Sequence, residues 1–184
     1  RQMCIRDRAY PFSEGRAFVI KNDYKELIDA NGNTIVKYKD DLERENFSDG
    51  YAIIRRNDKY GYINKSGKVV IKPSSKWYQV ESFSEGLASY WVGPTTFENA
   101  YGYINKKGKI VIKPSYGQAF QFSDGLACVQ DGKTYKYGFI NKKGKKVIKC
   151  TYDYALNFKN GLACVMKNGK SYMIDKKGKT ITIK

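Results

Sequence analysis

Lysines gathered in short turns are the residues of this sequence that could do chemistry. Its 184 residues include 34 Lys and Arg against 18 Asp and Glu, giving a net charge of +16. Twelve lysines lie in four similar turns that follow Asn or Asp: Lys65 and Lys68; Lys106, Lys107 and Lys109; Lys142, Lys143, Lys145 and Lys146; Lys176, Lys177 and Lys179. Aligned cations attract polyanions by counterion release. These lysines are therefore the candidate polyanion-binding residues.

Three tyrosines, Tyr60, Tyr101 and Tyr137, each stand four residues before one of these turns. If they are exposed beside the lysines, their rings could stack on bases or sugars, so they are candidate aromatic contacts. A structural role for the lysines is the alternative, since lysine protects edge strands and keeps an aromatic-rich β protein soluble. The excess of lysine over arginine favours this alternative, because phosphate and base recognition prefers the bidentate guanidinium.

No group of residues in the sequence matches the pattern of a catalytic or metal-binding site. The chain has no histidine, which removes the usual general base and metal ligand. Its acidic residues recur at equivalent turn positions, where a carboxylate can cap the backbone. A paired-carboxylate mechanism instead needs two acids in different environments. The four cysteines lack the short spacing of a zinc site. We therefore predict free thiols, no catalytic or metal-binding residue, no cofactor and no enzyme activity.

A repeat of about 36 residues organises the whole chain. The motif Phe-Ser-acid-Gly begins at Phe12, Phe47, Phe83 and Phe122, and a relaxed copy begins at Phe158. Such a period marks a unit that buries its apolar face only against its neighbours. The prediction is one array over residues 11–184, with copies at about 11–46, 47–82, 83–121, 122–157 and 158–184. Residues 1–10 form a non-repeat leader. Its first eight residues, 1–8, resemble a translated sequencing adapter, so we expect the true N-terminus to be missing.

Each copy reads as three strands joined by hairpins. Short aromatic and β-branched runs alternate with turns that end in glycine, such as Gly108 and Gly144, which suit a left-handed backbone. The predicted fold is all-β, a tandem repeat of three-stranded antiparallel meanders in an open twisted array. A β-propeller-like closure is the alternative, although a propeller blade uses four strands.

Two small residues recur where strands are expected to pack closely. Alanine is the second residue of the first strand in every copy, and glycine follows the second-strand tyrosine in three copies: Ala17, Ala52, Ala88, Ala127 and Ala163; Gly61, Gly102 and Gly138. A methyl group or hydrogen at each site predicts crowding by a neighbouring element. Length variation instead concentrates in residues 93–99, an insertion on one face of the array that could meet a protein partner.

The combined pattern of Gly-Leu-Ala-x-Val, aromatic-Gly-aromatic-Ile-Asn and Gly-Lys-x-Val-Ile-Lys-Pro resembles the bacterial WG-repeat family. The similarity spans about residues 11–184 and is clearest over 86–161. Tyr60, Tyr101 and Tyr137 replace the signature tryptophan before glycine. The resemblance implies tandem β repeats in a bacterial protein, often secreted or surface-associated, without established catalytic activity.

These observations predict a non-catalytic binding module of a bacterial surface or secreted protein, contacting an anionic polymer through the lysine-rich hairpins. A cytosolic nucleic-acid-binding array is one alternative, and an accessory region of a larger enzyme is another. Expected partners are a protein or an anionic polymer such as a cell-wall polymer or glycan, with nucleic acid as a further option. No stretch approaches the roughly 18 apolar residues of a membrane span. A secreted or surface location is favoured over a cytoplasmic one.

Overall fold

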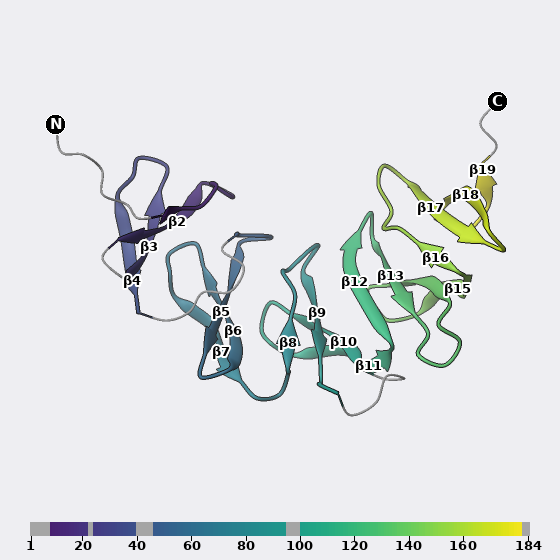
Figure 1. Ribbon diagram of the computed structural model, residues 1–184, viewed down its shortest axis with the longest axis horizontal. Coiled ribbons are helices and arrows are strands. Elements are labelled where there is room, and N and C mark those ends of the chain that lie inside the picture. The colour runs from purple at the N-terminus through teal and green to yellow at the C-terminus, as the bar shows by residue number, and fades with distance from the viewer. Residues whose placement is uncertain (1–7, 22–23, 40–45, 95–99, 182–184) are drawn as a thin grey trace. The chain divides into compact units, whose positions relative to one another are not determined.

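The computed structural model describes residues 8–21, 24–39, 46–94 and 100–181, and within these ranges it contains strands and turns but no helix. The strands form five antiparallel sheets, and none of the described sheets closes on itself (Figure 1). The chain divides into two compact units, Arg1–Trp77 and Tyr78–Lys184. The prediction of an all-β fold built from open antiparallel meanders is confirmed.

The unit Arg1–Trp77 holds two sheets in which strands that follow one another in sequence pair side by side. The first sheet contains β1 (Arg8–Ala9), β2 (Arg16–Lys21), β3 (Tyr24–Asp29) and β4 (Thr34–Tyr38). The second contains β5 (Tyr51–Arg56), β6 (Lys59–Asn64) and β7 (Val69–Ser74). Residues 8 and 9, which the sequence placed in the leader, thus pair with β2.

The unit Tyr78–Lys184 holds three four-stranded sheets, coloured teal to yellow in Figure 1. The first contains β8 (Gln79–Val80), β9 (Leu87–Trp91), β10 (Tyr101–Asn105) and β11 (Ile110–Tyr116). The second contains β12 (Gln118–Ser123), β13 (Leu126–Gln130), β14 (Tyr137–Asn141) and β15 (Lys146–Tyr152). The third contains β16 (Tyr154–Ala155), β17 (Leu162–Lys167), β18 (Lys170–Asp175) and β19 (Thr180–Ile181).

The fourth strand of these sheets is the element that the sequence did not predict. It precedes the Phe-Ser-acid-Gly turn, and it is either two residues long, as in β8 and β16, or interrupted by a register shift, as in β12 between Ala119 and Phe122. A two-residue strand or an interrupted one shows no sustained period-two alternation, which is the pattern that identifies a strand in a sequence. Four strands per copy bring each sheet closer to the make-up of a propeller blade.

Two kinds of turn join the strands, and both need left-handed backbone. In the Phe-Ser-acid-Gly turn the acid and the glycine both have positive φ, 56° at Asp124 and 84° at Gly125, as a two-residue type I′ hairpin requires. In the second kind, Asn105 Oδ1 accepts hydrogen bonds from the N–H groups of Lys107 and Lys109, at 3.0 and 3.1 Å. Gly108 closes this turn with φ of 72°, which confirms the left-handed glycine predicted there.

The core lies where the strands of neighbouring sheets meet. Ala127 is fully buried beside Tyr103, Phe122 and Ile140, and all five repeat alanines are at most 1% exposed. Tyr103 packs edge-on against Phe122 with ring centroids 5.0 Å apart, and its hydroxyl donates a hydrogen bond to a backbone carbonyl. The predicted crowding at the repeat alanines is therefore confirmed.

The repeat glycines are crowded by backbone rather than by side chains alone. A Cβ added to Gly138 would lie 2.6 Å from the carbonyl oxygen of Ile148 on β15. Equivalent carbonyl oxygens lie 2.5 Å from a Cβ on Gly61 and on Gly102. Only glycine therefore allows the last two strands of each of these sheets to approach this closely.

Successive sheets within a unit are held in fixed register by side-chain hydrogen bonds between equivalent turns. Ser84 Oγ donates to the carbonyl of Phe122 at 2.7 Å, and Glu85 accepts from the N–H of Gly125 at 3.0 Å. The acid of this turn was expected to cap a turn backbone, and it caps the turn of the next copy. Corresponding turns of neighbouring sheets therefore lie next to one another.

Candidate functional site

The unit Tyr78–Lys184 presents different side chains at the two ends of its strands. Tyr101 begins β10 and Asn105 ends it, so these residues are separated by roughly 13 Å along the strand. We call the end that carries the Asn-Lys turns the turn end, and the opposite end, where Trp91, Tyr101 and Gln118 lie, the loop end. Each end is a candidate binding surface.

Three lysine turns line the turn end, at residues 105–109, 141–145 and 175–179. A Cβ on Gly144 would lie 3.3 Å from Ile112 of the preceding sheet, and one on Gly178 would lie 3.5 Å from Ile148. The second and third turns thus rest on the last strand of the sheet before them, β11 and β15, and the three turns follow one another. The structure therefore brings together the lysines of these turns: Lys106, Lys107, Lys109, Lys142, Lys143, Lys145, Lys176, Lys177 and Lys179.

Some of the predicted lysines already have acidic partners. Lys142 forms an ion pair with Glu85 at 3.1 Å, and Lys146 lies 3.6 Å from Asp131. In the unit Arg1–Trp77, Lys65 pairs with Glu14 at 3.0 Å, while Lys68 is exposed. Ion pairs this exposed to solvent are weak, so they reduce but do not abolish the attraction of these lysines for an external anion. The exposed lysines Lys107, Lys143 and Lys177, which take the same place in the three turns, are the strongest candidates.

The predicted aromatic contacts do not lie beside the lysines, so that expectation was wrong. Tyr60 is buried, with 8% of its surface exposed, because the Arg55 guanidinium covers its ring at 5.5 Å and Trp77 packs nearby, donating to the Tyr60 carbonyl at 2.8 Å. Tyr101 and Tyr137 are half-buried and lie at the loop end. The reason is geometric: a residue four positions before a turn sits at the far end of a five-residue strand.

At the loop end, Tyr101 and Tyr137 belong to a longer row of rings that the sequence analysis did not identify. This aromatic strip comprises Tyr78, Trp91, Tyr101, Phe120, Tyr137 and Tyr154. Tyr78 meets Trp91 edge-on at 4.8 Å, and Trp91 stacks on Tyr101 at 6.2 Å. Further along, Tyr137 lies 6.3 Å from Phe120 and 5.8 Å from Tyr154. The sequence offered one signal, since Trp91 borders the insertion at residues 93–99.

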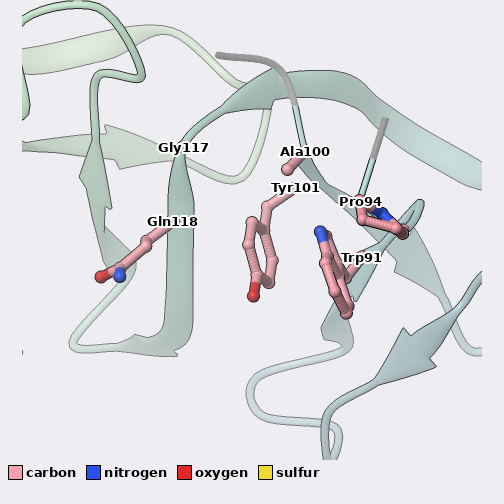
Figure 2. A pocket seen from close by; sticks show the side chains of 7 residues that line it. Trp91, Pro94, Ala100, Tyr101, Gly117 and Gln118 are labelled. Carbon is pink, nitrogen blue, oxygen red and sulfur yellow. The ribbon is translucent and has the colours of Figure 1, made fainter. Parts of the chain in front are cut away.

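A pocket of about 270 Å³ opens in the aromatic strip (Figure 2). It is lined by Trp91, Gly93, Pro94, Ala100, Tyr101, Gly117 and Gln118. A neighbouring hollow of about 350 Å³ shares Tyr101 and Gln118 and adds Glu81. Burial, with a contribution from the charge of Glu81, raises the pKa of the Tyr101 hydroxyl above its ordinary value of 10. Of the predicted insertion, Gly93 and Pro94 line the pocket and residues 95–99 lie outside the described residues.

The cysteines take no part in either surface's chemistry. Cys128 is fully buried, and this burial, with a contribution from Cys150, raises the pKa of its thiol to about 12. Cys150 and Cys164 are free and half-buried, while Cys4 lies outside the described residues. Across the described ranges, no three His, Cys, Asp or Glu residues are grouped so as to hold a metal ion. The part of the chain that the structure describes also has no helix able to span a membrane.

The WG containing repeat model matches residues 7–24, 27–60, 60–90, 101–135 and 137–170, and the chain belongs to this family. No curated protein matches the chain. Among solved structures, Kluyveromyces lactis Hsv2 is similar with a TM-score of 0.60 and 10% identity over 96% of this chain. A second structure of the same protein, Hsv2p, gives 0.58 and 10% over 100% of this chain. BamB from Moraxella catarrhalis gives 0.46 and 12% over 93% of this chain and 58% of its own.

The likeness to Hsv2 concerns the fold, which is β-propeller-like in these structures, whereas the sheets described here are open. This chain spans 63% of the length of the first Hsv2 structure and 67% of the second. Membership of the WG-repeat family fits a non-catalytic interaction module.

Proposed function

We propose that this WG-repeat chain is an interaction module of a bacterial surface or secreted protein that binds an extended anionic polymer along the lysine turns of its unit Tyr78–Lys184. The observation that carries the proposal is the succession of the turns at 105–109, 141–145 and 175–179, of which the second and third each rest on the sheet before them. A linear polymer can then meet lysines from three sheets in succession.

The charge of the unit supports this proposal. Residues 78–184 contain 18 lysines and seven acidic side chains. Two of the acids, Glu85 and Asp124, already accept hydrogen bonds from the N–H groups of Gly125 and Gly161 at the turn end. Their negative charge is held between the sheets, while the exposed lysines extend from the surface. A positive surface of this kind raises the local concentration of anionic ligands.

The residue type favours a polymer with repeated charges over a specific nucleic-acid sequence. Residues 78–184 contain no arginine, the side chain that reads bases and phosphates through bidentate hydrogen bonds. A lysine ammonium acts as a point charge and carries little sequence information. We therefore favour a phosphate- or sulfate-bearing cell-wall polymer or glycan over nucleic acid.

Binding to heparin, a purified wall teichoic acid and a single-stranded DNA 30-mer, each measured from 50 to 300 mM salt, tests the proposal. We expect affinity to fall steeply with salt. Changing Lys107, Lys143 and Lys177 to Ser should weaken binding about tenfold or more and lower the salt slope by roughly two to three.

The matched control changes three exposed lysines away from the turn end, Lys133, Lys167 and Lys170, to Ser, which alters the net charge equally. This control should bind almost as the unchanged protein does. Equal losses in both variants would show that only total charge matters. Absence of salt-dependent binding to all three polymers would contradict the proposal and leave the lysines a solubilising role.

A further inference from the structure

We infer that the loop end of the unit Tyr78–Lys184 binds a neutral oligosaccharide, with one sugar ring in the pocket beside Trp91 and Tyr101 and adjoining rings along the aromatic strip. This site is independent of the lysine turns, which lie at the other end of the strands. It therefore goes beyond the proposed binding of an anionic polymer.

The rings at the pocket form a platform held in place by the sheet. Trp91 and Tyr101 are cross-strand partners on β9 and β10, and their planes differ by 15°. Tyr78, itself 60% exposed, abuts Trp91 edge-on and supports it. Figure 2 shows the Trp91 and Tyr101 side chains next to each other, with Gln118 across from Tyr101. The negative face of an aromatic ring attracts the polarised C–H groups on the flat face of a sugar.

The size and shape of the pocket fit one small ring. Its volume of about 270 Å³ lies just below the roughly 300–1,000 Å³ of sites for drug-sized molecules. Gly93, Ala100 and Gly117 line it without large side chains. A monosaccharide unit can therefore approach the backbone while one face contacts Trp91 or Tyr101.

Polar groups next to the platform match sugar hydroxyls. Gln118 supplies an amide that both donates and accepts, and the Tyr137 hydroxyl lies 3.3 Å from its Oε1. Glu81, in the adjoining hollow, supplies a carboxylate that accepts. A sugar hydroxyl both donates and accepts, so it can satisfy either group. Loss of such a hydrogen bond in a partly enclosed site is costly, which gives selectivity.

The same features disfavour other occupants. Among the described residues that line the two hollows, Glu81 is the charged one, so a neutral sugar suits this site better than an anionic one. Aromatic grooves also bind polyproline segments. Glu81 and the Gln118 oxygen already accept from Gln79 Nε2 and from the Tyr137 hydroxyl. Prolines have no N–H group and could add no further donor to either. A neutral sugar satisfies both the rings and the polar groups.

The strip extends the site beyond one ring. Phe120 and Tyr154 are 40% and 49% exposed, and Tyr137 lies between them. These residues come from the second and third sheets of the unit, whereas Trp91 and Tyr101 come from the first. A chain of several sugars can therefore contact rings from three successive sheets, and longer oligosaccharides should bind more tightly than short ones.

The test is titration of the full chain with cellohexaose, chitohexaose and a decaproline peptide, followed by calorimetry and tryptophan fluorescence. The chain has two tryptophans, and Trp77 is buried, so a fluorescence change on binding should disappear in Trp91→Phe. We expect at least one hexasaccharide to bind with an affinity that changes little between 50 and 500 mM salt. Tyr101→Ala and Gln118→Ala should each weaken binding at least fivefold.

Two controls separate this site from the rest of the molecule. Tyr135→Ala removes an exposed tyrosine that lies at the loop end outside the strip, and it should bind as the unchanged chain does. The triple lysine variant at positions 107, 143 and 177 should bind polyanions more weakly and keep its oligosaccharide binding. Failure of both hexasaccharides to bind, binding of decaproline instead, or binding unaffected by Tyr101→Ala would each overturn the inference.

Discussion

The carboxylate of Asp124 accepts a 2.6 Å hydrogen bond from the backbone N–H of Gly161, which lies in the equivalent turn of the next copy of the repeat. The adjacent Ser123 donates to the carbonyl of Phe158 at 2.6 Å. Both residues of the Ser-acid pair therefore act on the following turn. This explains why the motif recurs at a nearly constant interval: each copy must place its turn within reach of the preceding one.

Removing the Asp124 carboxylate should weaken the contact between two neighbouring sheets. We expect Asp124→Ala to lower the free energy of unfolding by about 1–3 kcal/mol, because it leaves the Gly161 N–H without its acceptor and places alanine at a φ of 56°. Asp124→Asn retains an oxygen acceptor and tolerates this backbone, so it should cost less. Urea unfolding of both variants measures the difference. Equal costs would mean that neither the acceptor nor the backbone conformation matters.

Enlarging the buried alanine should strain the core. Ala127→Leu adds three carbons at a fully buried site beside Tyr103 and Phe122, and we expect a loss of roughly 1–3 kcal/mol. Val147→Leu, at an exposed position on the outer strand of the same sheet, is the control and should change stability little. Thermal unfolding is the measurement. An unchanged melting temperature for Ala127→Leu would contradict the tight packing described here.

Low pH should weaken the contact between the two sheets of the unit Arg1–Trp77. Burial alone would raise the pKa of Glu14, but hydrogen bonds from Lys65 and from the Gly50 N–H, together with the charge of Lys65, lower it below the ordinary 4.5. At a pH between the lowered pKa of Glu14 in the folded state and its ordinary value of 4.5, the unfolded chain binds a proton on Glu14 and the folded chain does not. Stability contributed by the Glu14 charge is therefore complete above about pH 5 and is lost as the pH falls through the lowered pKa.

The check compares the unchanged protein with Glu14→Gln, which keeps an oxygen acceptor but removes the charge. The difference in melting temperature should be largest near pH 6 and should shrink toward pH 3. A difference that stayed constant over this range would show that the charge contributes nothing to the contact between the two sheets.

Local patterns made much of the fold predictable. Gly108 and Gly144 end hairpins that only left-handed residues allow, and Ala127 marks a fully buried strand position where alanine recurs in every copy. The turn glycines follow from backbone geometry within one copy. The alanine shows in the sequence as a recurring small residue, although Tyr103 of the preceding sheet helps to bury it. The two-residue strands β8 and β16 were missed, because pairings this short depend on a neighbouring strand already being in place.

The candidate site was less predictable because it also depends on packing between different copies of the repeat. The recurrence of Lys107, Lys143 and Lys177 after Asn or Asp shows in the sequence that they share a turn, but only the packing of Gly144 on Ile112 puts successive turns next to each other. Tyr60 and Tyr101 occupy equivalent positions, yet one is covered by Arg55 and the other lines a pocket.

By itself, the sequence determined the repeat, the all-β class and the turns, since each follows from the conformational preferences of a few adjacent residues. Tertiary structure alone decided which of these side chains face solvent together. The aromatic strip from Tyr78 to Tyr154 and the separation of its rings from the lysine turns arise when sheets from distant segments pack. Burial and proximity across sheets are set by that packing, and no local preference encodes them.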